Sequence, residues 1–270
     1  MKSFFKRAIN LLKLGLAARA IKKSTSEEQR QWAKKYLVEL LGKSRGLPTK
    51  IGQFMTMDDP SSRDSLTDSI IPMPYEEVVG ILDKAYGKPF DTIFKKLGKS
   101  AKAASLGQVH FGKLKDGTEI AVKIQYPEIA SAVESELDIM GWLPKVGPVA
   151  KWGFKMDGYR DAFWANFKEE LDYNIESKHQ IQYRQLIPPL ERIVIPEVME
   201  DLCRPNVLVQ KKEEGFGLDK AETMMPAQKQ AMGRLLLEHY FHMLFRHGFV
   251  HADPQPANLA FRQYKKDYFV

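Results

Sequence analysis

The chain has 270 residues, of which 44% are hydrophobic, so it is long and apolar enough to bury a sizeable core. This composition excludes disordered and fibrous proteins and fits one large domain or two lobes. The single cysteine, Cys203, excludes an intramolecular disulfide framework and a CxxC metal pair, and therefore predicts a reducing compartment.

The net charge of +7 has a local origin. Seven of the 41 basic residues lie within residues 1–23, which contain no acidic residue, and the 34 that remain equal the 34 acidic residues of the chain. The rest of the chain is therefore neutral by formal count, and we expect no nucleic acid among its partners.

Residues 1–23 mix these basic side chains with apolar ones, a pattern that predicts an amphipathic helix. Three interpretations stay open: the helix attaches to an anionic membrane surface or lipid, it is an organelle transit peptide, or it packs on the domain as a solvated basic helix. The sequence has no run of about 18 apolar residues, so we expect no membrane-spanning helix.

Two further helices are predicted in the first third of the chain. One should begin after Ser26, because Ser26 and Gln29 have the spacing of a capping box, and should end near Leu41, closed by Gly42. The other should open at Pro74, because proline suits the first turn of a helix.

The spacing of the apolar residues then changes to that typical of β-strands. Residues 103–123 predict a β-hairpin with its turn at residues 115–118, because two short apolar runs flank a glycine-containing polar segment. Further strands are expected at 193–196 and 206–210, which are rich in β-branched residues.

Helical patterns return at residues 128–140 and 161–183. A long helix is then predicted from Pro226 to His247, with Gly248 as its C-terminal cap. The residues of this helix expected to face inward are Met232, Leu235, Leu236, Tyr240, Met243 and Leu244.

The loop after this helix, residues 251–258, places Asp253 and Asn258 five positions apart. This is the spacing of a phosphoryl-transfer catalytic loop, in which the aspartate accepts the substrate proton and the asparagine holds a magnesium ion. Carboxylate and amide oxygens are hard ligands that suit this chemistry. We therefore predict Asp253 as the catalytic base and Asn258 as a metal ligand, with His251 orienting the loop backbone.

A lysine within an apolar strand is the second chemical signal. Lys123 lies among Ala121, Val122 and Ile124, where an unpaired ammonium group is costly, so it needs a partner. The pattern fits the strand lysine that contacts ATP phosphates in kinases.

Together these segments resemble the UbiB/AarF family of atypical protein-kinase-like proteins. Four signatures occur in the family's order: Lys50–Gln53 as its lysine-x-glycine-glutamine motif, Ala103–His110 as its alanine-rich loop, Glu170–Asp172 as its glutamate-x-aspartate motif, and the His-Ala-Asp loop. Each signature alone is weak, but four in register are strong, and the match covers roughly residues 45–262.

The resemblance implies an α+β, bilobal protein-kinase-like fold with a helical N-terminal extension and a C-terminal lobe that is cut short. It implies an extension over residues 1–44, the family motif and N-terminal lobe over 45–215, and the start of the C-terminal lobe over 216–270. Because family members also serve mitochondria and plastids, we expect a cytoplasmic or peripheral membrane protein, or an organelle protein in a eukaryote.

The resemblance also implies ATP or ADP and Mg²⁺ as cofactors. Lys123 would pair with Glu176, the counterpart of the kinase αC glutamate, and both would act in catalysis. The nucleotide would contact Lys123 and the alanine-rich loop, whose expected contact residues are Ala103, Ala104, Ser105, Gly107 and Gln108.

A second implied pair joins Lys50 to Glu170 across the mouth of the active site. Gln53 and Asp172 complete this regulatory or occluding group, because the extension blocks the protein-substrate site in the family.

The residues themselves leave plainer alternatives open. For Lys123, the alternative is that the lysine reaches water while Glu176 lies on a solvated helix face. For Lys50 and Glu170, it is an exposed ion pair that contributes little free energy. For the alanine-rich loop, it is tight packing against a neighbouring segment. Three histidines of the long helix are interpreted as ordinary helix residues rather than metal ligands: His239, His242 and His247.

The sequence also departs from the family pattern. Gln255 and Ala257 stand where histidine and glycine are usual, Lys102 replaces an alanine, and residues 210–215 are more polar than an adenine-binding hinge. The sequence runs from Asn258 to Val270 without reaching the Asp-Phe-Gly segment that would hold magnesium. We expect an atypical kinase or ATPase supporting isoprenoid-quinone or membrane-lipid metabolism; the alternative is a catalytically inactive nucleotide- or lipid-binding module.

Overall fold

The computed structural model describes residues 13–17, 19–21, 23–44, 48–49, 62, 66, 69–133, 168–188, 192–251, 258–265 and 267–270. The helices are α2 (Glu27–Ser44), α5 (Tyr75–Tyr86), α8 (Tyr173–Leu186), α9 (Leu218–Glu222) and α10 (Pro226–His242), with short turns η1 (Phe90–Thr92), η3 (Glu200–Leu202) and η4 (Met243–His247). The strands are β1 (Phe94–Ala103), β2 (Gly107–Leu114), β3 (Glu119–Gln125), β4 (Val207–Lys211), β5 (Arg262–Tyr264) and β6 (Asp267–Phe269). None of the helices among these residues is long and apolar enough to cross a membrane.

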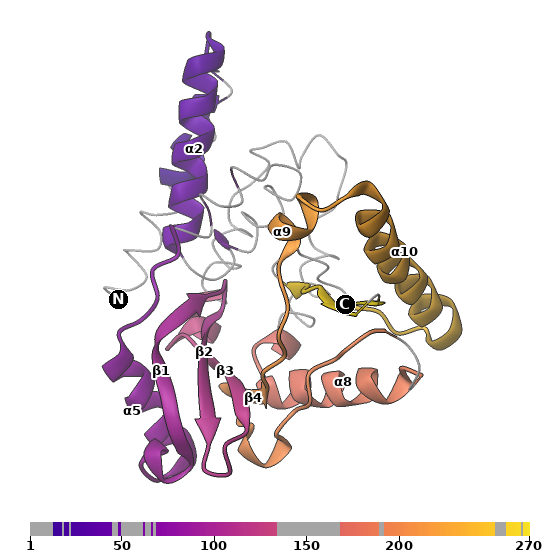
Figure 1. Ribbon diagram of the computed structural model, residues 1–270. Coiled ribbons are helices and arrows are strands. Elements are labelled where there is room, and N and C mark those ends of the chain that lie inside the picture. The colour runs from indigo at the N-terminus through magenta and orange to yellow at the C-terminus, as the bar shows by residue number, and fades with distance from the viewer. Residues whose placement is uncertain are drawn as a thin grey trace.

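The first four strands form one antiparallel sheet in the order β1-β2-β3-β4 (Figure 1). The predicted hairpin is confirmed as β2 and β3, whose turn is closed by Gly117 at φ 93° and by a hydrogen bond from Thr118 N to Asp116 Oδ1. Strand β1 was not predicted, because its four lysines and two register shifts obscure the alternation expected of a strand.

The main core lies between this sheet and α5. Val78 and Leu82 on α5 are fully buried in one cluster with Ile120, Val122 and Ile124 of β3. These β3 residues alternate with Lys123, so Lys123 must face the opposite side of the sheet. On that side α8 packs beside β4 (Figure 1).

The N-terminal helix α2 projects away from the sheet (Figure 1). It was predicted to end near Leu41, closed by Gly42, but it continues to Ser44. Leu41 is buried in a cluster with Leu37 and Leu66, which holds the last turn in place, and Ser44 Oγ donates a hydrogen bond to Leu40 O.

The long helix predicted from Pro226 is confirmed as α10 followed by the π-helical turn η4, and Gly248 ends it at φ 61°. The π turn inserts an extra residue and rotates the face that follows. Met243 is buried, as predicted, whereas Leu244, also predicted to face inward, is 46% exposed.

Two other predictions were wrong. Residues 193–196 form no strand; Val194 N instead bonds to Val270 O, and Pro196 has no N–H to donate to a ladder. The helix predicted over 161–183 is interrupted at residues 171–172, and α8 starts only at Tyr173. Most of the helix predicted at 128–140 lies outside the described residues.

Candidate functional site

Lys123 and Glu176 form an ion pair between the sheet and α8. Lys123 Nζ lies 2.7 Å from Glu176 Oε1 and 2.9 Å from Oε2, so one ammonium group contacts both carboxylate oxygens. The two side chains are 30% and 34% exposed. The expected contact is therefore present, and the alternative of a strand lysine and a helix glutamate that do not meet is wrong.

Tyr173 lies beneath this ion pair, a contact that the sequence analysis missed. Lys123 Nζ is 4.6 Å from the centre of the Tyr173 ring, a distance typical of a cation–π interaction. The tyrosine is fully buried with Cys203 and Leu208. Its position at the start of a helix, three residues ahead of the glutamate, was the only local signal available.

The surroundings stabilise the lysine as a cation. Burial opposes the charge, yet the pKa of Lys123 lies above its ordinary value, because the Tyr173 oxygen, the Glu176 carboxylate and, more distantly, Glu170 favour the ammonium form. Burial also raises the pKa of Tyr173 to about 12, so this tyrosine is a neutral phenol at physiological pH.

The glutamate-x-aspartate motif forms the start of α8. Asp172 is the N-cap, and its Oδ1 accepts a hydrogen bond of 2.9 Å from Asn174 N. Tyr173 N donates to Pro205 O, which ties the same end to the segment before β4. Asp172 thus positions the helix that carries Glu176, and Glu170 lies two residues before this cap. Their occluding role stays a prediction.

The alanine-rich loop is the turn between β1 and β2. Ala104 N donates a hydrogen bond of 2.8 Å to Gly107 O. At Gly107 an added Cβ would lie 2.3 Å from the carbonyl oxygen of Ile124, so only glycine permits β2 to approach β3 this closely. The loop with Ala103 and Ser105 therefore lies one strand away from Lys123.

The side chain of Gln108 has a different environment. Its Oε1 accepts a hydrogen bond from Met73 N at 2.7 Å, and its Nε2 lies 2.8 Å from His110 Nε2. Gln108 is fully buried opposite Ile124, on the α5 side of the sheet. Contact with a nucleotide is therefore limited to the Gln108 backbone, and it stays a prediction.

The remaining nominated residues belong to the loop and the extension. Asn258 is exposed, three residues before Phe261, whose backbone pairs with Phe216 in the segment that follows β4. Asp253, Lys50 and Gln53 lie outside the described residues, and their roles stay predictions.

Helix α8 is also bonded to α10. Tyr183 Oη lies 2.8 Å from His239 Nε2, and both residues are buried. The Tyr183 ring contacts Phe249, which lies just before the predicted catalytic loop. His239 is thus a packed helix residue, and no cluster of potential metal ligands occurs among the residues that the structure describes.

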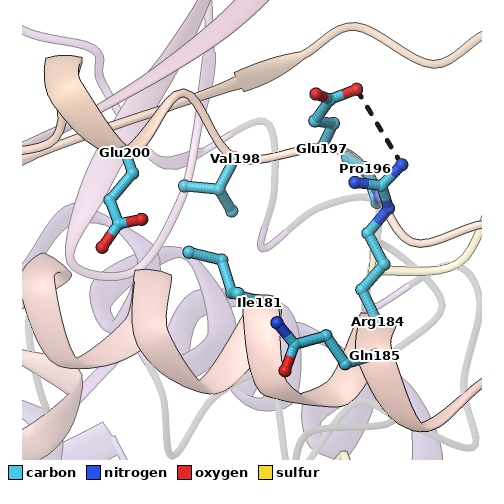
Figure 2. Close-up of a pocket in the computed structure, with 7 residues that line it drawn as sticks. All are labelled: Ile181, Arg184, Gln185, Pro196, Glu197, Val198 and Glu200. Carbon is cyan, nitrogen blue, oxygen red and sulfur yellow. Dashed lines mark ion pairs between the residues drawn. The ribbon is translucent and has the colours of Figure 1, made fainter.

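A pocket of about 420 Å³ lies on another side of α8, against the segment before β4. Figure 2 shows Ile181 and Val198 facing each other across it, with Arg184 directed toward Glu197 at 3.8 Å. None of the predicted site residues lines this pocket. The ion pair at Lys123 therefore defines the candidate site.

Comparisons with known proteins show what this chain is similar to. The family profile described as the ABC1 atypical kinase-like domain matches residues 65–270. Atypical kinase coq-8, mitochondrial, from Caenorhabditis elegans is 26% identical over 239 residues, which cover 85% of this chain and 32% of that protein. Protein ACTIVITY OF BC1 COMPLEX KINASE 8, chloroplastic, from Arabidopsis thaliana is 29% identical over 260 residues, 87% of this chain and 33% of that protein.

A solved structure, described as the complex of Rv3197 with erythromycin from Mycobacterium tuberculosis, superposes with a TM-score of 0.60 at 28% identity. The match covers 88% of this chain and 62% of that one. The expected α+β, kinase-like fold class is confirmed. The chain spans about a third of the length of the two curated relatives.

Proposed function

Because the chain belongs to the ABC1 atypical kinase-like family, the family that its UbiB/AarF motifs indicated, we propose that it binds ATP or ADP with Mg²⁺ and catalyses phosphoryl transfer or ATP hydrolysis. The observation that carries the proposal is the ion pair between Lys123 and Glu176.

The geometry of this pair suits phosphate binding. An ammonium group has three N–H donors, and the two oxygens of Glu176 take two of them. The third remains for a phosphate oxygen, and the lysine is exposed enough to reach one. Because Glu176 and Tyr173 hold the Nζ atom in place, little side-chain entropy is lost when a nucleotide binds.

The other nominated residues would complete the reaction. The bond between the terminal phosphorus and its bridging oxygen breaks while a bond forms to the acceptor oxygen, and Asp253 takes the proton of the acceptor. Asn258 is the nominated ligand of Mg²⁺, which neutralises phosphate charge when bound. The backbone of the loop from Ala103 to Gly107 would cover the phosphates from the neighbouring strand.

Nucleotide binding and turnover test the proposal separately. The full chain is titrated with a fluorescent ATP analogue in Mg²⁺ or EDTA, and phosphate release from ATP is followed in parallel. We expect Lys123→Ala to weaken binding at least about tenfold, because a charged hydrogen bond to phosphate is lost. Asp253→Asn should keep binding and abolish phosphate release.

Lys113→Ala is the matched control. Lys113 also pairs with a glutamate on the same sheet, Glu119 at 3.1 Å, but at the hairpin end away from α8. Equal effects of Lys113→Ala and Lys123→Ala would count against the assigned site. Binding by the wild type without any turnover would favour the alternative, a catalytically inactive nucleotide-binding module.

We further propose that the protein supports isoprenoid-quinone or membrane-lipid metabolism, as the family resemblance implies. It would act in an organelle or at a membrane surface. Two curated relatives are named as mitochondrial and chloroplastic proteins. Sedimentation with anionic liposomes, with and without residues 1–23, tests the membrane part; equal sedimentation of both forms would contradict it.

A further inference from the structure

Two glutamines form a hydrogen-bonded pair on the Lys123 side of the sheet. Gln180 on α8 donates from Nε2 to Gln210 Oε1 on β4 at 3.0 Å, and from the same nitrogen to Pro196 O at 2.8 Å. Gln180 lies one helical turn after Glu176, so the pair lies next to the candidate site.

These contacts fix which way the Gln210 amide points. The carbonyl of Pro196 can only accept a hydrogen bond, so Gln180 must present its NH₂ group to it. Gln210 must then present its oxygen to Gln180, and its own NH₂ group is directed elsewhere. Within the described part of the chain, no hydrogen bond uses this nitrogen, so two donors of fixed orientation remain.

The strand register places these donors relative to Lys123. Lys123 pairs with Leu208, and Ala121 pairs with Gln210, so Lys123 and Gln210 lie on one face of the sheet. They are separated along the strands by two residues, about 7 Å. Strand β4 ends at Lys211, and residues 212–217, the crossing segment, lead from it to α9. A nucleotide bound with its phosphates at Lys123 and its base toward the crossing segment would pass Gln210.

We propose that Gln210 is a specificity-determining residue that favours purines with a 6-oxo group, guanine or hypoxanthine, relative to adenine. This inference rests on the proposed nucleotide-binding function. Adenine carries an amino group at position 6, so the fixed Gln210 NH₂ group meets another donor there, whereas a 6-oxo group accepts its hydrogen bond. The mismatch weakens binding because the Gln210 donor and the adenine amino group both stay unpaired in the complex.

The test compares ITP with ATP on the full chain in Mg²⁺, by displacement of a fluorescent nucleotide. ITP isolates position 6, because it lacks the 2-amino group of GTP. We expect ITP to bind the wild type at least as tightly as ATP. In Gln210→Glu the new carboxylate still accepts from Gln180 but presents no donor, so the ratio of affinities should shift about tenfold toward ATP. Its charge weakens both nucleotides alike and cancels in the ratio.

Gln180→Leu provides an independent variant. It frees the Gln210 amide to rotate and match either base, so the preference should be lost but not inverted. Gln185→Leu is the matched control, because Gln185 lies on the same helix but lines the pocket of Figure 2, and it should leave the ratio unchanged. Thermal unfolding of each variant confirms that the fold is intact.

The outcomes separate this inference from the proposed function. Tight ATP binding, with an ATP-to-ITP ratio that stays the same in Gln210→Glu and Gln180→Leu, would overturn the role of Gln210 and leave the proposed function standing. A chain that binds no nucleotide in Mg²⁺ would overturn both.

Discussion

Tyr183 and His239, 56 residues apart in sequence, are joined by a hydrogen bond of 2.8 Å between Oη and Nε2. The bond links the helix that carries Glu176 to the helix that precedes the predicted catalytic loop. Helix α8 is thus held by the sheet through Lys123 and by α10 through Tyr183. The ion pair and helix α10 therefore share one supporting element.

Tyr183→Phe tests this link. The substitution keeps the ring contacts but removes the hydroxyl from a buried histidine, so we expect a loss of about 1–2 kcal/mol in the free energy of unfolding, measured in urea. Nucleotide affinity should fall as well, because α8 loses one of its supports. Tyr36→Phe, at an exposed tyrosine stacked on Trp32, is the control and should change neither quantity.

The ion pair predicts non-additive effects in a double-mutant cycle. Lys123→Met and Glu176→Gln should each weaken nucleotide binding, and the double variant should lose less than the sum of the two. In urea unfolding we expect a coupling of about 1–2 kcal/mol, reduced from that of a buried pair by partial exposure.

Arg234 and Glu238 provide the comparison pair. They lie 2.6 Å apart on α10, but their side chains are 77% and 60% exposed, so solvent screens the interaction. We expect no measurable coupling there. A cycle for Lys123 and Glu176 that is as additive as this one would show that the sheet and α8 are not coupled through the pair.

Much of this arrangement was predictable because its signals are local. The hairpin of β2 and β3 followed from a glycine turn between apolar runs, and Lys123 was predicted to need a partner because it interrupts an apolar strand. The spacing of the family motifs supplied Glu176 as that partner.

What the sequence did not reveal depends on distant contacts. Tyr173 occupies a position that a helix pattern treats like any other, and only the packing of α8 places its ring under Lys123. The Gln108 side chain bonds to Met73, 35 residues away, which no local pattern encodes. Tertiary packing also decided against a strand at residues 193–196, despite their β-branched composition.

Tyr173 predicts a specific pH dependence. Burial raises its pKa from 10.0 to about 12, so between these values the unfolded chain loses the phenolic proton while the folded chain keeps it. Stability from this group is complete below pH 10 and falls as the pH rises toward 12, by about 2–3 kcal/mol in total. Urea unfolding of Tyr173→Phe from pH 8 to 11.5 should show a shallower decline than the wild type.

Tyr86 is the comparison residue for the Tyr173→Phe experiment, because its hydroxyl is hydrogen-bonded. Both tyrosine hydroxyls are shielded, but Tyr86 donates a hydrogen bond of 2.7 Å to Leu202 O, whereas the Tyr173 hydroxyl has no hydrogen-bond partner among the described residues. Tyr86→Phe should therefore lose about 1 kcal/mol at neutral pH, and Tyr173→Phe should lose nothing or gain. Equal losses in the two variants would contradict a Tyr173 hydroxyl that has no hydrogen-bond partner in the part of the chain that the structure describes.

Gly107 and Gly80 predict opposite effects of the same substitution. In Gly107→Ala the new Cβ would lie 2.3 Å from Ile124 O and 3.1 Å from Gln125 Cα. Both are backbone atoms of β3, a strand paired on both sides, so they cannot move cheaply, and we expect a loss of more than about 2 kcal/mol. Any shift of β3 also moves Lys123, so nucleotide affinity should fall with stability.

Gly80→Ala serves as the internal comparison, measured in the same urea titrations. Gly80 is exposed on α5, and nothing lies within 4 Å of an added Cβ there. Because alanine loses less backbone entropy than glycine in a helix, this variant should gain about 0.5–1 kcal/mol. If Gly107→Ala were equally well tolerated, β2 and β3 would not approach as closely as the structure shows, and the place of the alanine-rich loop beside Lys123 would have to be revised.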